Sequence, residues 1–121
     1  MVFDSNLVIY ARLPEHERLA AFMETVPIEV SVASKIEVIG YHKLSPEALT
    51  SLSVFFDNVT VHELNDVIVD EAIRLRQQRK MSLGDAIIAG TALVFGSSLA
   101  THNAKDFAWI DGLDVVDPLA A

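Results

Sequence analysis

The chain has 121 residues, no cysteine and a net charge of −8. This length indicates one domain over residues 1–121, and the lack of cysteine excludes disulfides and thiolate zinc sites. The acidic charge argues against indiscriminate coating of nucleic acid, because lysine and arginine supply most of the affinity for phosphate. No apolar run reaches the ~20 residues that span a membrane, and residues 1–4 lack a signal-peptide pattern, so we expect a cytoplasmic protein.

Short apolar runs alternate with helical patterns along the whole chain, and proline or glycine separates several of them. In chain order the patterns predict a strand over 1–3, helices over 7–10 and 15–24, a strand over 28–32, helices over 34–43 and 46–56, a strand over 59–61, helices over 66–80 and 82–95, and strands over 97–100 and 115–116. This alternation predicts an α/β fold with a mostly parallel sheet of four to five strands and helices on both faces.

Ligands of parallel sheets bind beside the carboxyl ends of the strands, and polar residues follow two of the predicted strands there. Asp4 and Asn6 follow the first strand, and Thr101 and Asn103 follow the fourth. Asp-Ser-Asn is also ordinary chemistry for capping the next helix. Asp4 is therefore a candidate metal ligand or a helix cap, and Asn6 a residue that orients the turn.

Two further acids lie near predicted helix starts. Ser34-x-x-Glu37 fits a capping box, and Ser82-x-x-Asp85 has the same spacing. Gly84 favours more than capping at Asp85, because glycine within a helix costs about 1 kcal/mol relative to alanine and suggests close approach by another group. Asp106 also has two interpretations, as a metal ligand or as the cap of a short turn.

If these acids converge, they require a cation. Two carboxylates about 4 Å apart repel by roughly 1 kcal/mol in water and about 4 kcal/mol at an effective dielectric constant near 20. Carboxylate ligands without cysteine favour the hard ions Mg²⁺ and Mn²⁺. This reasoning predicts metal-assisted phosphodiester chemistry.

Four positive charges lie close together on the polar side of the helix predicted over 66–80. They are Arg74, Arg76, Arg79 and Lys80. The group is either a local patch that faces an anion or a solvated helix face.

Four segments together resemble the PIN-domain ribonucleases, particularly the small VapC-type toxins of toxin–antitoxin pairs. The segments are Val2-Phe3-Asp4-Ser5-Asn6, Ser34-x-x-Glu37, Gly84-Asp85-Ala86-Ile87-Ile88-Ala89 and Leu99-Ala100-Thr101-His102-Asn103-x-x-Asp106-Phe107. The likeness runs from residue 1 to about residue 118 in the order of the family.

The resemblance implies a PIN-like three-layer α/β/α sandwich, with the first strand central and the second and third on one side. It implies that Asp4, Glu37 and Asp85 are catalytic and bind Mg²⁺ or Mn²⁺, with Asp106 or Asn103 in the position of a fourth acid. Asn6, Thr101 and Asn103 would position the substrate. The basic group of Arg74, Arg76, Arg79 and Lys80 would guide the RNA backbone.

The implied function is that of a metal-dependent endoribonuclease toxin that forms a homodimer and binds a cognate antitoxin. The alternative is a non-catalytic acidic module, either a receiver-like domain or a PIN fold kept for partner binding. A receiver would need an acidic pair near the first strand and a lysine after the fifth, whereas Asp4 is single and Pro118 follows the last strand without a lysine.

Overall fold

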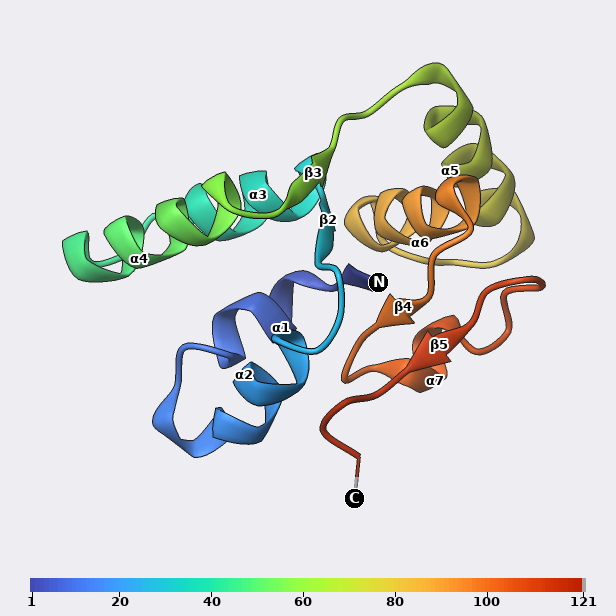
Figure 1. Cartoon of the computed structure of the whole chain (residues 1–121). Helices are drawn as coiled ribbons and strands as arrows, with labels where there is room; N and C mark the ends of the chain where they lie inside the picture. Colours follow the sequence, from blue (N-terminus) through green and yellow to red (C-terminus); the bar gives the residue numbers. More distant parts are fainter. Residues whose placement is uncertain (121) are drawn as a thin grey trace.

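The computed structural model describes residues 1–120, so Ala121, the last residue of the predicted domain, lies outside the described residues. Its strands are β1 (Val2–Phe3), β2 (Glu29–Ser31), β3 (Thr60–His62), β4 (Leu99–Ala100) and β5 (Val115–Val116). They form one sheet in the order β3-β2-β1-β4-β5, and every pairing is parallel (Figure 1). The predicted parallel sheet with a central first strand is confirmed.

Helices connect the strands and cover the sheet on both faces. They are α1 (Ser5–Tyr10), α2 (Glu17–Met23), α3 (Val32–Ile39), α4 (Pro46–Asp57), α5 (Asp66–Gln78), α6 (Leu83–Phe95) and α7 (Ala104–Phe107), with a 3-10 turn at Pro14–His16. Helices α5 and α6 lie side by side on one side of the sheet, and α1 and α2 lie on the other (Figure 1). This arrangement is the predicted three-layer sandwich.

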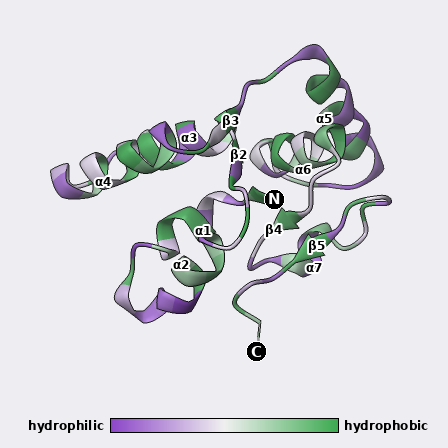
Figure 2. Cartoon of the chain, viewed as in Figure 1, coloured by the Kyte–Doolittle hydropathy of each residue, from purple (hydrophilic) through white to green (hydrophobic). Residues whose placement is uncertain are grey.

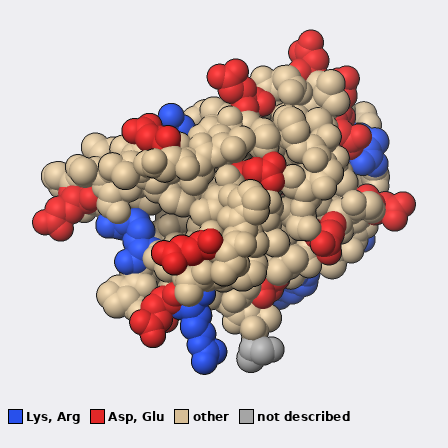
Figure 3. Space-filling view, in the orientation of Figure 1, with Lys and Arg blue, Asp and Glu red and all other residues tan. Residues whose placement is uncertain are grey.

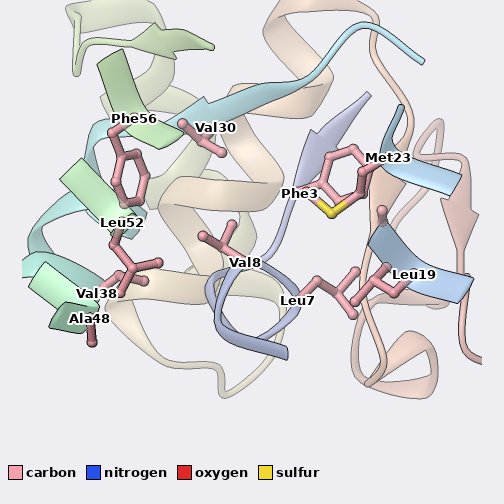
Figure 4. Packing of buried hydrophobic residues seen from close by; sticks show 11 residues of the cluster. Phe3, Leu7, Val8, Leu19, Met23, Val30, Val38, Ala48, Leu52 and Phe56 are labelled. Carbon is pink, nitrogen blue, oxygen red and sulfur yellow. The ribbon is translucent and has the colours of Figure 1, made fainter. Parts of the chain in front are cut away.

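Successive residues of the central strands pack into opposite cores because side chains alternate across a sheet. Val2 and Leu99 belong to the core under α6, which is apolar along most of its length (Figure 2). Phe3 and Ala100 belong to the core under α1 to α4. Figure 4 shows Phe3 beside Met23 of α2 in that core. Two-residue strands therefore suffice to join both helix layers.

The predicted boundaries around β2 are wrong by a few residues. The strand ends at Ser31, and α3 begins at Val32 instead of Ser34. The Ser31 hydroxyl accepts a hydrogen bond from the backbone amide of Ala33 at 3.0 Å, so Ser31 is the N-cap. The helix ends at Ile39 with Gly40 as its C-cap, short of the predicted Lys43.

A partly buried acid lies near the edge of the sheet where the strands begin. Glu29 accepts hydrogen bonds from the amino group of Met1 at 2.7 Å and from the Ser97 hydroxyl, and it pairs with His62 at 2.8 Å. Burial alone would raise the pKa of Glu29, but the hydrogen bonds to the amino group, His62 and Ser97 outweigh it and lower the pKa to about 2. The ionised Glu29 carboxylate therefore links β1, β2 and β3, and the amino group of Met1 balances its charge.

No helix within residues 1–120 has the length and apolar character needed to cross a membrane. Acidic side chains are spread widely over the face shown in Figure 3, and basic side chains form a few small groups. On this face the acidic residues are therefore not gathered into a single patch.

Candidate functional site

Asp4 lies directly after the central strand β1 and begins α1. One carboxylate oxygen, Oδ1, accepts a hydrogen bond from the backbone amide of Ser5 at 2.7 Å. The other, Oδ2, accepts one from the Thr101 hydroxyl at 2.9 Å. Asp4 is therefore both a helix cap and a carboxylate fixed by β4, with only 6% of its surface exposed.

Thr101 links the two central strands at the edge where they end. Its hydroxyl donates to Asp4 and accepts from the backbone amide of Asn103 at 3.1 Å, and its side chain is fully buried. Asn103 is exposed at the N-cap position of α7. Asn6 is exposed on the first turn of α1, where the partner of Asp4 is the amide of Ser5 instead of the Asn6 side chain.

Glu37 reaches the same edge of the sheet from the middle of α3. Its Oε1 accepts a hydrogen bond from the Ser5 hydroxyl at 3.2 Å, so it does not form the capping box with Ser34. Ser34 is instead buried inside α3, and its hydroxyl has no hydrogen-bond partner among the described residues. A β-carbon added at Gly84 would lie 3.1 Å from Glu37 Oε1. The close approach expected at Gly84 is therefore made by an acid of the predicted site.

Asp85 brings a third carboxylate from the first turn of α6. Its pKa is raised by partial burial and then by the negative charge of Asp4, while hydrogen bonding to Ser82 lowers it and the charges of Glu37 and Asp106 raise it further. Asp106 lies on α7 and lines a cavity of about 260 Å³ together with Asp85. Three acids, at the end of β1 and on α3 and α7, thus act electrostatically on Asp85 of α6.

The donor chemistry of these acids fits a hard divalent cation. All four offer carboxylate oxygens, and none of them forms an ion pair with a basic side chain in the part of the chain that the structure describes. No three His, Asp or Glu side chains within residues 1–120 converge closely enough to enclose an ion as they stand. An ion coordinated by three of these acids would require at least one of them to rotate, and Glu37 and Asp106 are the exposed members.

The four predicted basic residues separate into two groups. Arg74 pairs with Glu71 at 2.7 Å, and Arg76 donates to the carbonyl oxygen of Met81 at 3.2 Å. Arg79 and Lys80 line the cavity that Asp85 and Asp106 also line.

Three residues of this region escaped the sequence reasoning. Ser5 contacts both Asp4 and Glu37, while Lys105 and Trp109 line the cavity beside Asp85. Ser5 carried a signal within the Asp-Ser-Asn segment, in which only Asp4 and Asn6 were predicted to have a functional part. No sequence pattern singled out Lys105 and Trp109, because their place in the cavity depends on how the α7 region packs against the end of α5.

Comparisons with known proteins identify the family and the fold of the chain. A model of the PIN domain matches residues 1–113. The chain belongs to the PIN-domain family. No curated protein sequence matches it. The predicted family resemblance is therefore confirmed over nearly the whole chain.

Solved structures similar to this PIN domain come from toxin–antitoxin complexes. A chain of such a complex from Klebsiella pneumoniae is 27% identical, with a TM-score of 0.83 over 99% of this chain and 98% of that chain. DNA-bound VapBC from Salmonella typhimurium gives 20% identity and a TM-score of 0.85, with 97% and 96% covered. VapBC-1 from nontypeable Haemophilus influenzae is 22% identical, with a TM-score of 0.81 over 99% of this chain and 100% of that chain. The last two matches show a shared fold.

The buried hydrogen bond between Thr101 and Asp4 predicts a stability effect. Thr101→Val removes a donor to a buried carboxylate, and we expect it to lower the free energy of unfolding by about 1.5–3 kcal/mol at pH 7. Urea unfolding followed by circular dichroism measures this. Thr101→Ser keeps the hydroxyl and should lose clearly less; equal losses in the two variants would assign the effect to packing of the methyl group.

The repulsion at Asp85 predicts a pH-dependent gain in stability. Because the folded state raises the pKa of Asp85, its carboxylate destabilises the fold at any pH above that raised value, and the penalty disappears as the pH falls below the ordinary aspartate range. Asp85→Asn should therefore raise Tm at pH 7 by about 3–5 °C for each kcal/mol of repulsion removed. Thermal unfolding in EDTA from pH 7 to pH 3 should show the gain shrinking with acidity, and a variant less stable than wild type at pH 7 would contradict this.

Proposed function

We propose that this PIN domain is a Mg²⁺- or Mn²⁺-dependent endoribonuclease that acts as the toxin of a cytoplasmic toxin–antitoxin pair. The observation that carries the proposal is the arrival of Asp4, Glu37, Asp85 and Asp106 at one edge of the sheet from four separate helices. Stabilising hydrogen bonds and the apolar core hold these like charges near one another, which costs free energy without a cation. Such an arrangement is expected where a cation is part of the function.

Each acid has a distinct part in this proposal. The ion would be held by the four acids Asp4, Asp85, Glu37 and Asp106. It would neutralise charge at the phosphate and activate a water. Asp4 is the fixed member, because Ser5 and Thr101 orient both of its oxygens. Glu37 is exposed and bonded only through Ser5, so it is free to rotate toward the ion or to accept a proton from the attacking water. Thr101 acts on the substrate side through the backbone of Asn103, whose exposed side chain would contact the phosphate or a water.

The nuclease proposal predicts cleavage that depends on both metal and acids. The protein should cut RNA in Mg²⁺ or Mn²⁺ and stop in EDTA, and Asp85→Asn should reduce the rate by at least about 100-fold because an acid of the metal site is lost. Gel analysis of a labelled RNA and growth after induced expression measure the two consequences. Asp57→Asn is the matched control, because this exposed acid ends α4 just before β3 begins, at the opposite edge of the sheet.

Two outcomes would contradict the nuclease proposal. Cleavage retained in Asp85→Asn would place the chemistry elsewhere or reveal a contaminating nuclease. A folded wild-type protein that binds Mn²⁺ but cuts no RNA would favour the alternative of a PIN fold kept for partner binding.

The partner in this proposal is an antitoxin with a basic segment. The similar structures from Klebsiella pneumoniae, Salmonella typhimurium and Haemophilus influenzae are toxin–antitoxin complexes. An arginine or lysine inserted among the four acids would offset their repulsion, just as a metal ion would. Inhibition would then follow from competition for the same negative site.

We assign the homodimer surface to the outer face of α5 and α6. A groove of about 700 Å³ lies there, and exposed apolar residues that include Leu64, Ile73 and Leu83 line it. Asp70 and Glu71 occupy the first half of α5, and positive charge begins at Arg74. Two copies of α5 packed antiparallel across a two-fold axis would set acidic halves against basic halves, which makes this face electrostatically self-complementary.

The dimer assignment predicts that one apolar residue controls association. Ile73 is 51% exposed in the groove, and Ile73→Glu should weaken dimerisation on the order of 10- to 100-fold. Sedimentation equilibrium measures the dissociation constant. Leu49→Glu on α4 is the matched control, because Leu49 is similarly exposed at 43% but lies on another helix. Loss of the dimer in Leu49→Glu with retention in Ile73→Glu would move the interface to α4.

A further inference from the structure

A second feature lies beside the acids and is not explained by metal binding. The cavity of about 260 Å³ next to Asp85 and Asp106 also has three basic residues and an indole in its lining. These are Arg79, Lys80, Lys105 and Trp109. The cations come from the end of α5 and from α7, so the fold collects them from segments about 25 residues apart in the chain. In a chain of net charge −8, this is a local reversal of sign at the edge of the acidic site.

A hydrogen bond and contact with the core hold Trp109 in this cavity. Its Nε1–H donates to the carbonyl oxygen of Asp106 at 2.9 Å, and its ring packs against the core that contains Phe107. The Arg79 guanidinium lies over the indole ring, 4.8 Å from its centroid. The ring therefore presents a face to a charged side chain, and an aromatic face that can hold a guanidinium can also stack with the π-face of a nucleobase.

The size and charge of the cavity select the ligand further. Its volume lies slightly below the roughly 300 Å³ at which pockets for drug-sized ligands begin, so it suits a single base or a comparable group. Arg79, Lys80 and Lys105 would bind phosphate, whereas the carboxylates of Asp85 and Asp106 repel it. A phosphate chain that crosses this region would therefore contact the cations and leave one phosphodiester facing the acids.

We infer that this cavity is a nucleotide subsite, in which one base adjacent to the scissile phosphate stacks on Trp109 while Arg79, Lys80 and Lys105 bind the flanking phosphates. The inference rests on the proposed nuclease function and names the chain's own contacts with the substrate. The base takes the place of the Arg79 guanidinium over the indole, and that guanidinium turns to a phosphate. Because a base paired within a duplex cannot enter, the subsite selects single-stranded RNA.

Trp109 is the one tryptophan of the chain, so its fluorescence reports on this cavity alone. The full chain in EDTA is titrated with a short single-stranded RNA that carries a terminal dye, and both indole fluorescence and dye anisotropy are recorded. The same strand is then tested with an abasic nucleotide at each position in turn. We expect the RNA to quench the indole, and one abasic position to remove the quenching and weaken binding by about 5- to 150-fold.

Substitutions test the same inference without the indole signal. Trp109→Leu removes the aromatic face, and we expect weaker anisotropy-detected binding by the same factor, whereas Trp109→Phe retains most of the affinity. Arg79→Gln should weaken binding, and Arg18→Gln is its matched control because Arg18 is exposed on α2, on the other side of the sheet, and does not line the cavity. If Trp109→Leu fails to fold, the arginine pair and the abasic series decide.

Three results would overturn the inference. RNA that binds by anisotropy without changing the indole signal would place the strand elsewhere. An abasic series without any sensitive position, or equal effects of Arg79→Gln and Arg18→Gln, would reduce the contact to general charge attraction. Absence of any RNA binding, or quenching by an arginine-rich peptide alone, would assign the cavity to a protein partner. Because these measurements use EDTA, they are independent of cleavage, which tests the proposed function in Mg²⁺.

Discussion

Repulsion among four carboxylates is the constraint on which the functional end of this molecule depends. Asp85 has a raised pKa because burial and the charges of Asp4, Glu37 and Asp106 all oppose its ionisation. Folding holds these groups near one another because Asp4 is fixed by the amide of Ser5 and the hydroxyl of Thr101, and because two apolar cores fix the helices that carry the others. The free energy of the core therefore maintains a site that a cation, a basic partner or a proton would relieve.

The contrast between Glu29 and Asp85 shows how neighbouring groups decide the behaviour of a half-buried acid. Burial raises the pKa of both carboxyl groups. At Glu29 the amino group of Met1, His62 and Ser97 overcome that effect, and the pKa falls to about 2. At Asp85 the neighbours are further acids, and the pKa rises. The negative charge of Glu29 is balanced by a neighbouring amino group and by hydrogen-bond donors, whereas the charged neighbours of Asp85 are themselves negative.

The organisation of the sheet and most of the helices could be predicted from local pattern. Alternating apolar runs and amphipathic stretches give the order of elements, because the periods of strands and helices differ. The start of α3 could not be predicted in this way, because Ser31 and Ser34 are both residue types that cap helices. Only the pairing of Glu29 with Thr60 in the parallel register sets where β2 lies and leaves Ser31 as the residue that caps α3.

The sequence by itself determined the family and the positions of the acids along the chain. It predicted a hard cation from their carboxylate chemistry, which is the same in any packing. Tertiary structure alone decided which groups meet. It joined Glu37 to Ser5 and Gly84, divided the basic residues between an ion pair with Glu71 and a cavity at Asp85, and placed Arg79 over Trp109. These contacts join residues far apart in the chain, so their formation depends on helix packing, which no local pattern of residues specifies.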